Sequence, residues 1–246
     1  MSGHSKWHNI QAKKGKADAA RGRIFTKLGR EIAVAARGNP NPATNSKLAD
    51  VIAKAKAANM PNDNIERSIK RAAGELGDKD YKELTYEGYG VSGSAVIIST
   101  LTDNNNRTAG DIRAIMTKHG GSLGMTGSVS YQFERKGLVV VERTPDLDED
   151  AMTDYAIEAG ADDVVTQEDV YEVYTSVEAF SEVRKFLEGK GLNFLEADLG
   201  MFPTNKITLP EDKLETFKKM LDKLEENDDV QTVWHNVELP EEEDEE

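Results

Sequence analysis

The stretch Gly137-Leu-Val-Val-Val-Glu142 is a short apolar run rich in β-branched residues, which is typical of a buried strand. The pattern that follows it predicts, in order, a helix over 150–158, strands over 163–166 and 171–175, a helix over 177–187 and a strand over 192–196. The order strand-helix-strand-strand-helix-strand is that of a ferredoxin-like unit. The sequence therefore predicts one α+β domain of this kind within residues 136–200.

Similar elements flank this domain on both sides. Before it we expect a strand over 95–101, a helix over 108–118 and a strand over 128–133, and after it a strand over 206–209, a helix over 212–224 and a strand over 230–234. Joined across the gap, these elements repeat the same order, so we predict a second ferredoxin-like domain, 81–135 plus 201–238, into which the first is inserted. One continuous sheet is the alternative. Residues 239–246 form an acidic tail.

Residues 1–80 predict a helical domain that begins with a basic arm. The arm, 3–22, is rich in Lys, Ala and Gly. A first helix is expected over 23–37, with Ile24, Leu28 and Ile32 on its packing face and the Gly38-Asn-Pro-Asn-Pro42 segment ending it. A second helix begins near Thr44 or Asn45 and stops around Asn59, and a third follows Met60-Pro61. Residues 74–80 are expected to be a linker.

Charge is unevenly distributed along the chain. The whole chain of 246 residues has a net charge of -14, yet residues 1–80 carry 16 Lys and Arg against 8 Asp and Glu. Such a basic block is typical of a segment that binds polyanions, because clustered cations attract phosphate whatever the total charge. We therefore predict nucleic-acid contacts from Lys6, Lys13, Lys14, Lys16, Arg21, Arg23, Lys27, Arg30, Arg37, Arg67, Lys70 and Arg71. An ordinary solvated helix face is the alternative for any one of these helices alone.

Two further features of the second half bear on partners. Asn104-Asn-Asn-Arg107 leads into the helix expected at 108, where free backbone N–H groups favour an anion, so Arg107 is added to the predicted nucleic-acid contacts. A plain turn with Asn106 as the helix cap explains the same residues equally well. Residues 136–200 hold 17 acidic and 5 basic residues, so this domain is expected to repel nucleic acid and to have a protein partner, if any.

The motifs that could indicate cofactor binding, metal binding or catalysis lack the neighbouring elements or residues that these functions require. Gly88-Tyr-Gly-Val-Ser-Gly93 matches the dinucleotide fingerprint, but a strand follows it where a helix is required, so a glycine turn between strands is the better interpretation. Asp146-x-Asp-x-Asp150 lacks the Gly and Glu of a calcium loop and instead suits a helix N-terminus. The chain has no Cys, and none of its four His residues has an obvious catalytic partner. We expect a protein that is not an enzyme and has no cofactor, metal or small-molecule substrate.

Aromatic residues on a sheet stack bases in some RNA-recognition domains, and Tyr131 and Phe133 alternate as that mode requires. The basic-Gly-aromatic pattern of those domains is absent, because Lys136-Gly137 is followed by Leu-Val-Val. Core packing is therefore the expected role of both aromatic side chains.

A set of motifs resembles one known family. They are Gly3-His-Ser-Lys-Trp7, Arg21-Gly-Arg-Ile-Phe-Thr-Lys27, Asn59-Met-Pro-Asn-Asp-Asn64, Tyr86-Glu-Gly-Tyr-Gly90, Thr102-Asp-Asn-Asn-Asn-Arg-Thr108, Gly120-Gly-Ser-Leu-Gly124 and Gly127-Ser-Val-Ser-Tyr131. In this order they resemble the YebC/PmpR family, which includes a mitochondrial translational activator. The resemblance runs from about Ser2 to Asn236, and only the acidic tail lies outside it.

The resemblance implies a cytoplasmic bacterial protein with a helical N-terminal domain and two α+β domains. Members are described either as transcriptional regulators that bind promoter DNA or as translation factors that act on ribosomes stalled at proline-rich stretches. Both roles require a polyanion-binding surface. We expect promoter DNA first, as the broader family description, and ribosomal RNA as the alternative, which gains some weight because the sequence shows no evident dimerisation seam. The sequence has no apolar run of the ~20 residues that span a membrane, so no membrane partner is expected.

Overall fold

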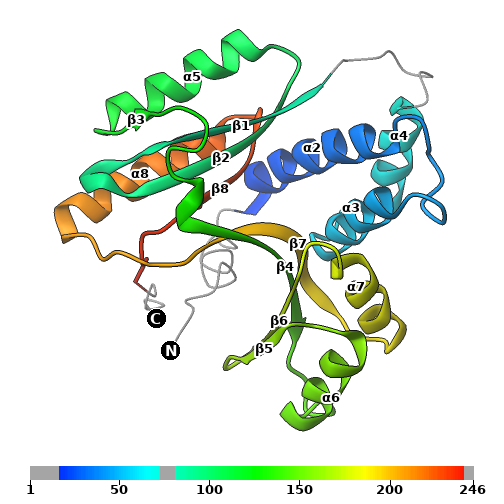
Figure 1. Cartoon of the computed structure of the whole chain (residues 1–246). Coiled ribbons are helices and arrows are strands. Elements are labelled where there is room, and N and C mark those ends of the chain that lie inside the picture. The colour runs from blue at the N-terminus through cyan, green and yellow to red at the C-terminus, as the bar shows by residue number, and fades with distance from the viewer. Residues whose placement is uncertain (1–16, 73–80, 241–246) are drawn as a thin grey trace. The chain divides into compact units, whose positions relative to one another are not determined.

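The computed structural model describes residues 17–72 and 81–240. In these ranges, three helices precede two sheets that are each accompanied by helices (Figure 1). The chain divides into two compact units: one comprises 1–27, 79–134 and 201–246, and the other comprises 28–78 and 135–200. Each unit is therefore assembled from segments that are distant in the sequence.

The helices of the N-terminal region are α2 (Ala17–Ala36), α3 (Ser46–Ala57) and α4 (Asn62–Ala72). Gly38 follows α2 with a φ of 79°, a left-handed conformation that suits glycine just past a helix end. The Asn45 side chain accepts a hydrogen bond from the Leu48 backbone N–H at 3.1 Å and so caps α3. The predicted helix end and the predicted cap are both confirmed.

Two expectations for α2 were wrong. The helix begins at Ala17, within the stretch predicted to be an arm, because its Ala-rich sequence has high helix propensity. Leu28 and Ile32 are buried as expected, but Ile24 retains 46% exposure. Among the residues whose exposure is described, the fully buried positions of α2 begin at Leu28, and Arg21 lies on a helix.

The inserted sheet has the element order that the sequence predicts. It consists of β4 (Phe133–Glu142), β5 (Asp163–Thr166), β6 (Val170–Thr175) and β7 (Phe194–Pro203), with α6 (Glu149–Ala159) after β4 and α7 (Phe180–Gly189) after β6. The strand order is β5-β6-β4-β7, so the first and third strands of the series are central. Alternate residues Val139 and Val141 of β4 pack against Met152 of α6 and Val183 and Leu187 of α7.

The second sheet is built around a hairpin. Its strands are β1 (Lys82–Tyr89), β2 (Ala95–Thr102), β3 (Ser122–Leu123) and β8 (Val230–His235), in the order β3-β1-β2-β8. Helices α5 (Asn105–Lys118) and α8 (Glu211–Glu226) cover one face, where Val96 and Ile98 of β2 meet Ile112, Met116 and Phe217. The opposite face of β2 presents Ala95 and Ile97 to Val129 and Phe133.

The α+β class is confirmed, and there are two four-stranded sheets instead of one continuous sheet. Along the chain, the elements of the second sheet nevertheless differ from the expected strand-helix-strand-strand-helix-strand order, since two strands precede α5. The strand β1 escaped the sequence pattern because most of its side chains are exposed or half-buried and polar. The strand expected over 128–133 is instead the 3₁₀ turn Ser130–Gln132, and the one expected over 206–209 contributes only an isolated bridge from Ile207 to Val237.

The Gly88-to-Gly93 motif ends β1 and forms the turn into β2, as the structural interpretation predicted. The turn η1 (Val91–Gly93) is closed by a hydrogen bond from the Gly90 N–H to the Ser94 carbonyl at 2.7 Å. Glycine is required at Gly88 because a Cβ there would lie 2.3 Å from the Ser122 carbonyl oxygen of β3. The motif therefore serves strand pairing.

Buried and half-buried ion pairs join α3 to the inserted sheet and its helix α7. The Arg184 Nε donates to Asp50 Oδ1 at 2.8 Å, and the Ser181 hydroxyl donates to the same carboxylate. Lys54 pairs with Asp198 of β7 at 2.7 Å and with Glu31 of α2 at 2.8 Å. Because these contacts all lie within one compact unit, α3 and the inserted sheet belong to the same packed body.

Candidate nucleic-acid interface

The predicted nucleic-acid contacts fall into three groups. Lys6, Lys13, Lys14 and Lys16 lie outside the described residues. Arg21, Arg23, Lys27, Arg30 and Arg37 lie on or directly after α2, and Arg67, Lys70 and Arg71 lie on α4. Arg107 belongs to α5 of the other sheet. The structure thus places the basic residues on separate elements, with most of the described ones on α2 and α4.

The basic stripe of α4 is formed by Arg67, Lys70 and Arg71. Their spacing puts them on one side of the helix, opposite Ile65 and Ser68, which are buried. All three basic residues are exposed. In the described part of the chain, no acidic group lies within ion-pair distance of any of them. Within 17–72 and 81–240, the fold therefore presents three cations that have no partner.

The basic residues of α2 have more varied surroundings. Arg23, Arg30 and Arg37 are spaced seven residues apart, so they follow one line along the helix. Arg23 and Arg37 are exposed, whereas Arg30 is half-buried. Lys27 is also half-buried, and its ammonium donates to the Glu225 carbonyl at 2.7 Å. Lys27 is thus partly engaged within the fold.

Helices α2 and α4 approach each other closely at one point. A Cβ on Gly29 would lie 3.1 Å from the Ser68 hydroxyl oxygen and 4.0 Å from Met60. The Ser68 hydroxyl is itself turned back onto the Asn64 carbonyl, at 2.9 Å. Because Arg30 adjoins Gly29 and Arg67 adjoins Ser68, this crossing lies next to basic residues of both helices.

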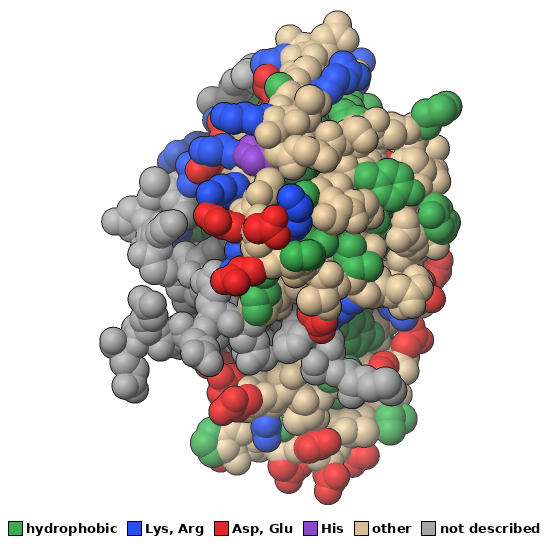
Figure 2. Space-filling model, turned by 90° about the vertical axis from the view of Figure 1, so that its left-hand side faces the viewer, with side chains coloured by type: hydrophobic (Ala, Val, Ile, Leu, Met, Phe, Trp, Pro, Cys, Tyr) green, Lys and Arg blue, Asp and Glu red, His purple; other side chains and the backbone are tan. Residues whose placement is uncertain are grey.

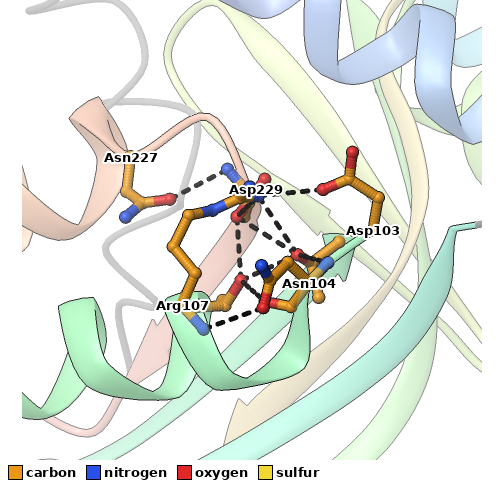
Figure 3. Close-up of polar contacts among 7 residues, drawn as sticks. Asp103, Asn104, Arg107, Asn227 and Asp229 are labelled. Atoms are coloured by element: carbon orange, nitrogen blue, oxygen red, sulfur yellow. Dashed lines mark hydrogen bonds and ion pairs between the residues drawn. The ribbon is translucent and has the colours of Figure 1, made fainter.

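Arg107 is held in a polar network around the carboxylate of Asp229 (Figure 3). Its Nη2 lies 2.6 Å from Asp229 Oδ2 and 3.0 Å from Asp103 Oδ1. The hydroxyls of Thr102 and Thr108 also donate to Asp229 Oδ2, at 3.2 and 2.8 Å. The helix cap is Asn104, whose side chain accepts from the Arg107 N–H at 3.1 Å, and is not Asn106, the cap that the plain-turn alternative named. The geometry gives Arg107 a structural role.

These contacts affect the ionisation of Asp229. Burial would raise the pKa of this carboxyl group, but the hydrogen bonds from Arg107, Thr108 and Thr102 outweigh it and hold the pKa below its ordinary value. The carboxylate remains charged at neutral pH. It therefore joins the start of β8 to the loop that opens α5.

Sequence reasoning missed a loop that Glu87 organises. The Glu87 carboxylate is buried and accepts backbone hydrogen bonds from Gly127, Val129 and Ser130, at 2.8, 2.9 and 2.8 Å. The Glu87 carbonyl also accepts from the Gly124 N–H at 2.8 Å. One residue of β1 thus fixes the loop over 124–130. No local sequence signal marks this role, because the partners are about 40 positions away.

Two side chains stand out from this loop. Met125 is 84% exposed and Tyr131 is 73% exposed, whereas Phe133 is 7% exposed. The predicted role in core packing is therefore confirmed for Phe133 and wrong for Tyr131.

Charge is patterned on the surface. On the face shown in Figure 2, Lys and Arg side chains gather beside a histidine. Within 17–72 and 81–240, no three His, Asp or Glu side chains come together as a possible metal site. No helix in the same ranges has the length and apolar character needed to cross a membrane.

Asp146-x-Asp-x-Asp150 is a helix start, as predicted. The Asp148 side chain accepts from the Ala151 N–H at 2.8 Å and caps α6.

Comparison with known proteins identifies relatives over the whole chain. Residues 5–75 match the model of the TACO1/YebC protein N-terminal domain, and residues 81–237 match that of the TACO1/YebC second and third domain. A probable transcriptional regulatory protein of Clostridium tetani is 55% identical over 243 residues, covering 98% of this chain and 99% of the relative. One of Clostridium botulinum strain Okra is 57% identical, with 98% of each chain covered.

A solved structure is also similar. The crystal structure of a conserved hypothetical protein from Aquifex aeolicus has a TM-score of 0.82 and 45% identity, and the match covers 95% of this chain and 97% of that one. The family models and these relatives agree with the resemblance carried by the sequence motifs. The chain belongs to the TACO1/YebC family.

Proposed function

We propose that the chain is a cytoplasmic regulatory protein that binds nucleic acid through the exposed basic residues of α2 and α4, and that it acts on transcription at promoter DNA. The names of its relatives, probable transcriptional regulatory proteins, support the regulatory role. The residues that carry the proposal are Arg67, Lys70 and Arg71 of α4, which are exposed cations without a partner among the described residues. Arg107 is not included, because two carboxylates already neutralise it.

Phosphate is the ligand that suits this stripe. Three exposed cations on one helix face repel one another, and in the described part of the chain no carboxylate offsets that repulsion. A polyanion relieves it and releases its own condensed counterions on binding, which is the main source of affinity for a nucleic-acid backbone. Arg23 extends the basic character along α2. The inserted domain is strongly acidic, and we propose that its partners are proteins.

Charge reversal of the α4 stripe tests the binding surface. The variant Arg67→Glu/Lys70→Glu/Arg71→Glu should bind a mixed-sequence DNA duplex at least about tenfold more weakly than the unaltered protein, because phosphate contacts supply most non-specific affinity. The matched control is Lys213→Glu/Lys219→Glu/Lys223→Glu on α8, which changes the net charge equally on exposed residues that already pair with neighbouring acids. Equal weakening in both variants, or none in the first, overturns the assignment.

The cellular target is tested by crosslinking the protein in growing cells and sequencing the nucleic acid that copurifies. Enrichment of a small set of promoter segments supports transcriptional regulation. Enrichment of ribosomal RNA overturns promoter binding and favours the second candidate, a translation factor that relieves stalling at proline-rich stretches. One observation favours that second candidate: the exposed aromatic ring of Tyr131, which suits an unpaired base.

A further inference from the structure

We propose that the loop over 124–131 is a second nucleic-acid contact, on which Tyr131 stacks an unpaired RNA base beside Met125. The inference rests on the proposed nucleic-acid binding but concerns a different surface from the basic helices. It starts from exposure: in the described residues the large apolar side chains that remain exposed are Ile24, Met125, Tyr131 and Ile157, and two of these four belong to this one loop.

The ring of Tyr131 is held in place although it is exposed. Its hydroxyl accepts a hydrogen bond from the Gln132 Nε2 at 3.3 Å and lies near the Tyr89 phenol, whose pKa it raises. The Tyr89 hydroxyl donates in turn to the Ser128 carbonyl at 2.9 Å. An aromatic ring fixed at its polar end keeps both a defined orientation and an open face. Binding a base therefore costs little conformational entropy of the Tyr131 side chain.

The backbone beneath the ring is equally constrained. Glu87 holds the loop by the N–H groups of Gly127, Val129 and Ser130. Val129 between them is fully buried and packs against Ala95 and Ile97 of β2. The loop is thus attached to the sheet by Glu87 and Val129, and the exposure of Met125 and Tyr131 is a property of the fold.

The composition of the loop favours a base over a protein surface. Residues 120–132 contain no charged side chain and are mainly Gly, Ser and Thr, which lets another backbone or a planar ring approach closely. Two apolar side chains are too few for the core of a stable protein interface, which buries ~800 Å² on each partner. One open aromatic ring, in a loop that also exposes a flexible thioether, matches the size of a single base.

One exposed cation precedes the loop in the chain and belongs to the same unit. Lys118 is exposed in the last turn of α5, three residues before Gly121, and Gly121 donates to the Met116 carbonyl at 2.8 Å. The uncharged loop therefore leaves directly from a helix end that carries a positive charge. RNA is the polymer whose unpaired bases are commonly recognised by stacking, so single-stranded RNA is the ligand that we commit to.

The test measures binding of the full chain to an oligouridylate of about 12 nucleotides, a length typical for single-strand binding sites. Tyr131→Ala should weaken this binding about tenfold, since stacking on one aromatic ring contributes ~1–3 kcal/mol per base. Tyr131→Trp should restore it, because the indole offers a larger ring. Photocrosslinking with 5-iodouridine should label the peptide that contains Tyr131.

The controls separate this inference from the proposed function. Binding of a DNA duplex should be unchanged in Tyr131→Ala and lost in the α4 charge-reversal variant. Unchanged RNA binding in Tyr131→Ala, failure of Tyr131→Trp to restore it, or equal weakening with a DNA oligonucleotide of the same length overturns the loop assignment while leaving the basic stripe intact. RNA binding that depends on Tyr131, together with duplex binding that survives the α4 charge reversal, supports the loop and contradicts the proposed helical interface.

Discussion

Glu87 is a buried carboxylate whose charge is matched mainly by backbone N–H groups. Burial raises the pKa of Glu87, but the hydrogen bonds from Gly127, Val129 and Ser130 outweigh it, and the pKa is lowered overall. A carboxyl group with a lowered folded-state pKa stabilises the protein fully above its unfolded value of ~4.3. That contribution is lost as the pH falls through the folded-state pKa.

The variant Glu87→Gln should release the loop. Its amide group offers one acceptor oxygen where the carboxylate offered two, so at least one backbone N–H is left unsatisfied at a cost of ~1–3 kcal/mol. Hydrogen exchange at the Gly127, Val129 and Ser130 amides should accelerate at neutral pH. In the unaltered protein the same acceleration should appear only at acidic pH. The control is Glu83→Gln, an exposed glutamate of the same strand. Unchanged protection in Glu87→Gln contradicts the loop assignment.

Asp229 allows a second test of how a single carboxylate stabilises the fold. Asp229→Asn removes the charge that Arg107 contacts at 2.6 Å and turns an acceptor of three hydrogen bonds into a mixed donor and acceptor. We expect a loss of about 1–3 kcal/mol in the free energy of unfolding, measured by urea denaturation at neutral pH. Because the pKa of Asp229 is lowered, the difference between variant and parent should shrink as acid protonates the parent carboxylate. A difference that stays constant down to acidic pH speaks against this account.

At the scale of elements, α3 is joined to α7 and β7 by charges that the fold shields from water. The side chain of Arg184 is 3% exposed, so removing its partner Asp50 leaves a buried charge with only Glu188, itself 55% exposed. Lys54 is similar. Burial lowers its pKa, yet Asp198 and Glu31 raise it above its ordinary value, so the ammonium keeps its charge through neutral pH and loses it only well into alkali.

Asp50→Asn should therefore loosen α3. Breaking one partner of a buried pair costs ~3–5 kcal/mol, and the cost should appear as faster amide exchange in α3 and α7. Asp63→Asn on α4 is the control, since Asp63 is exposed. If Asp50→Asn lowers amide protection only in α4, or nowhere, the role of this ion pair in holding α3 is contradicted.

Sequence reasoning succeeded where the cause is local. The helix end at Gly38 and the caps at Asn45 and Asp148 follow from residue types within a few positions. It failed where the cause is distant. Arg184 meets Asp50 across 134 positions, and nothing near either residue announces the pairing. The strand β1 was missed for a related reason, because its pairing with β2 is set by hydrogen bonds while its own side chains are largely polar.

The candidate interface also has one part that the sequence predicted and one part that it did not. The basic stripe of α4 could be predicted, since helical spacing alone places Arg67, Lys70 and Arg71 on one face. The loop with Tyr131 could not, because its exposure depends on Glu87 and on the packing of Val129.

For the whole molecule, binding must occur despite a net charge of -14. A protein that repels polyanions at long range and attracts them through one basic region should associate slowly at low salt, because steering follows the total field. Its affinity should still fall with added salt, because each phosphate contact changes log K against log salt by about -0.9. Replacing Arg67, Lys70 and Arg71 by Glu should therefore make the slope less steep by about 3 units, measured by titration of a DNA duplex at several salt concentrations. A salt-independent affinity contradicts a phosphate interface.

The interleaving of the two units determines the order in which the chain can fold as it is synthesised. All segments of the unit that holds β4 to β7 are available once residue 200 has been made. The other unit waits for β8, because β2 pairs with Val230–His235 as well as with β1. Until then the backbone groups along one side of β2 have no strand to bond to, and an open strand edge promotes aggregation. The C-terminal strand therefore acts as the closing step of assembly, and a chain cut short before residue 230 should be prone to associate with other chains.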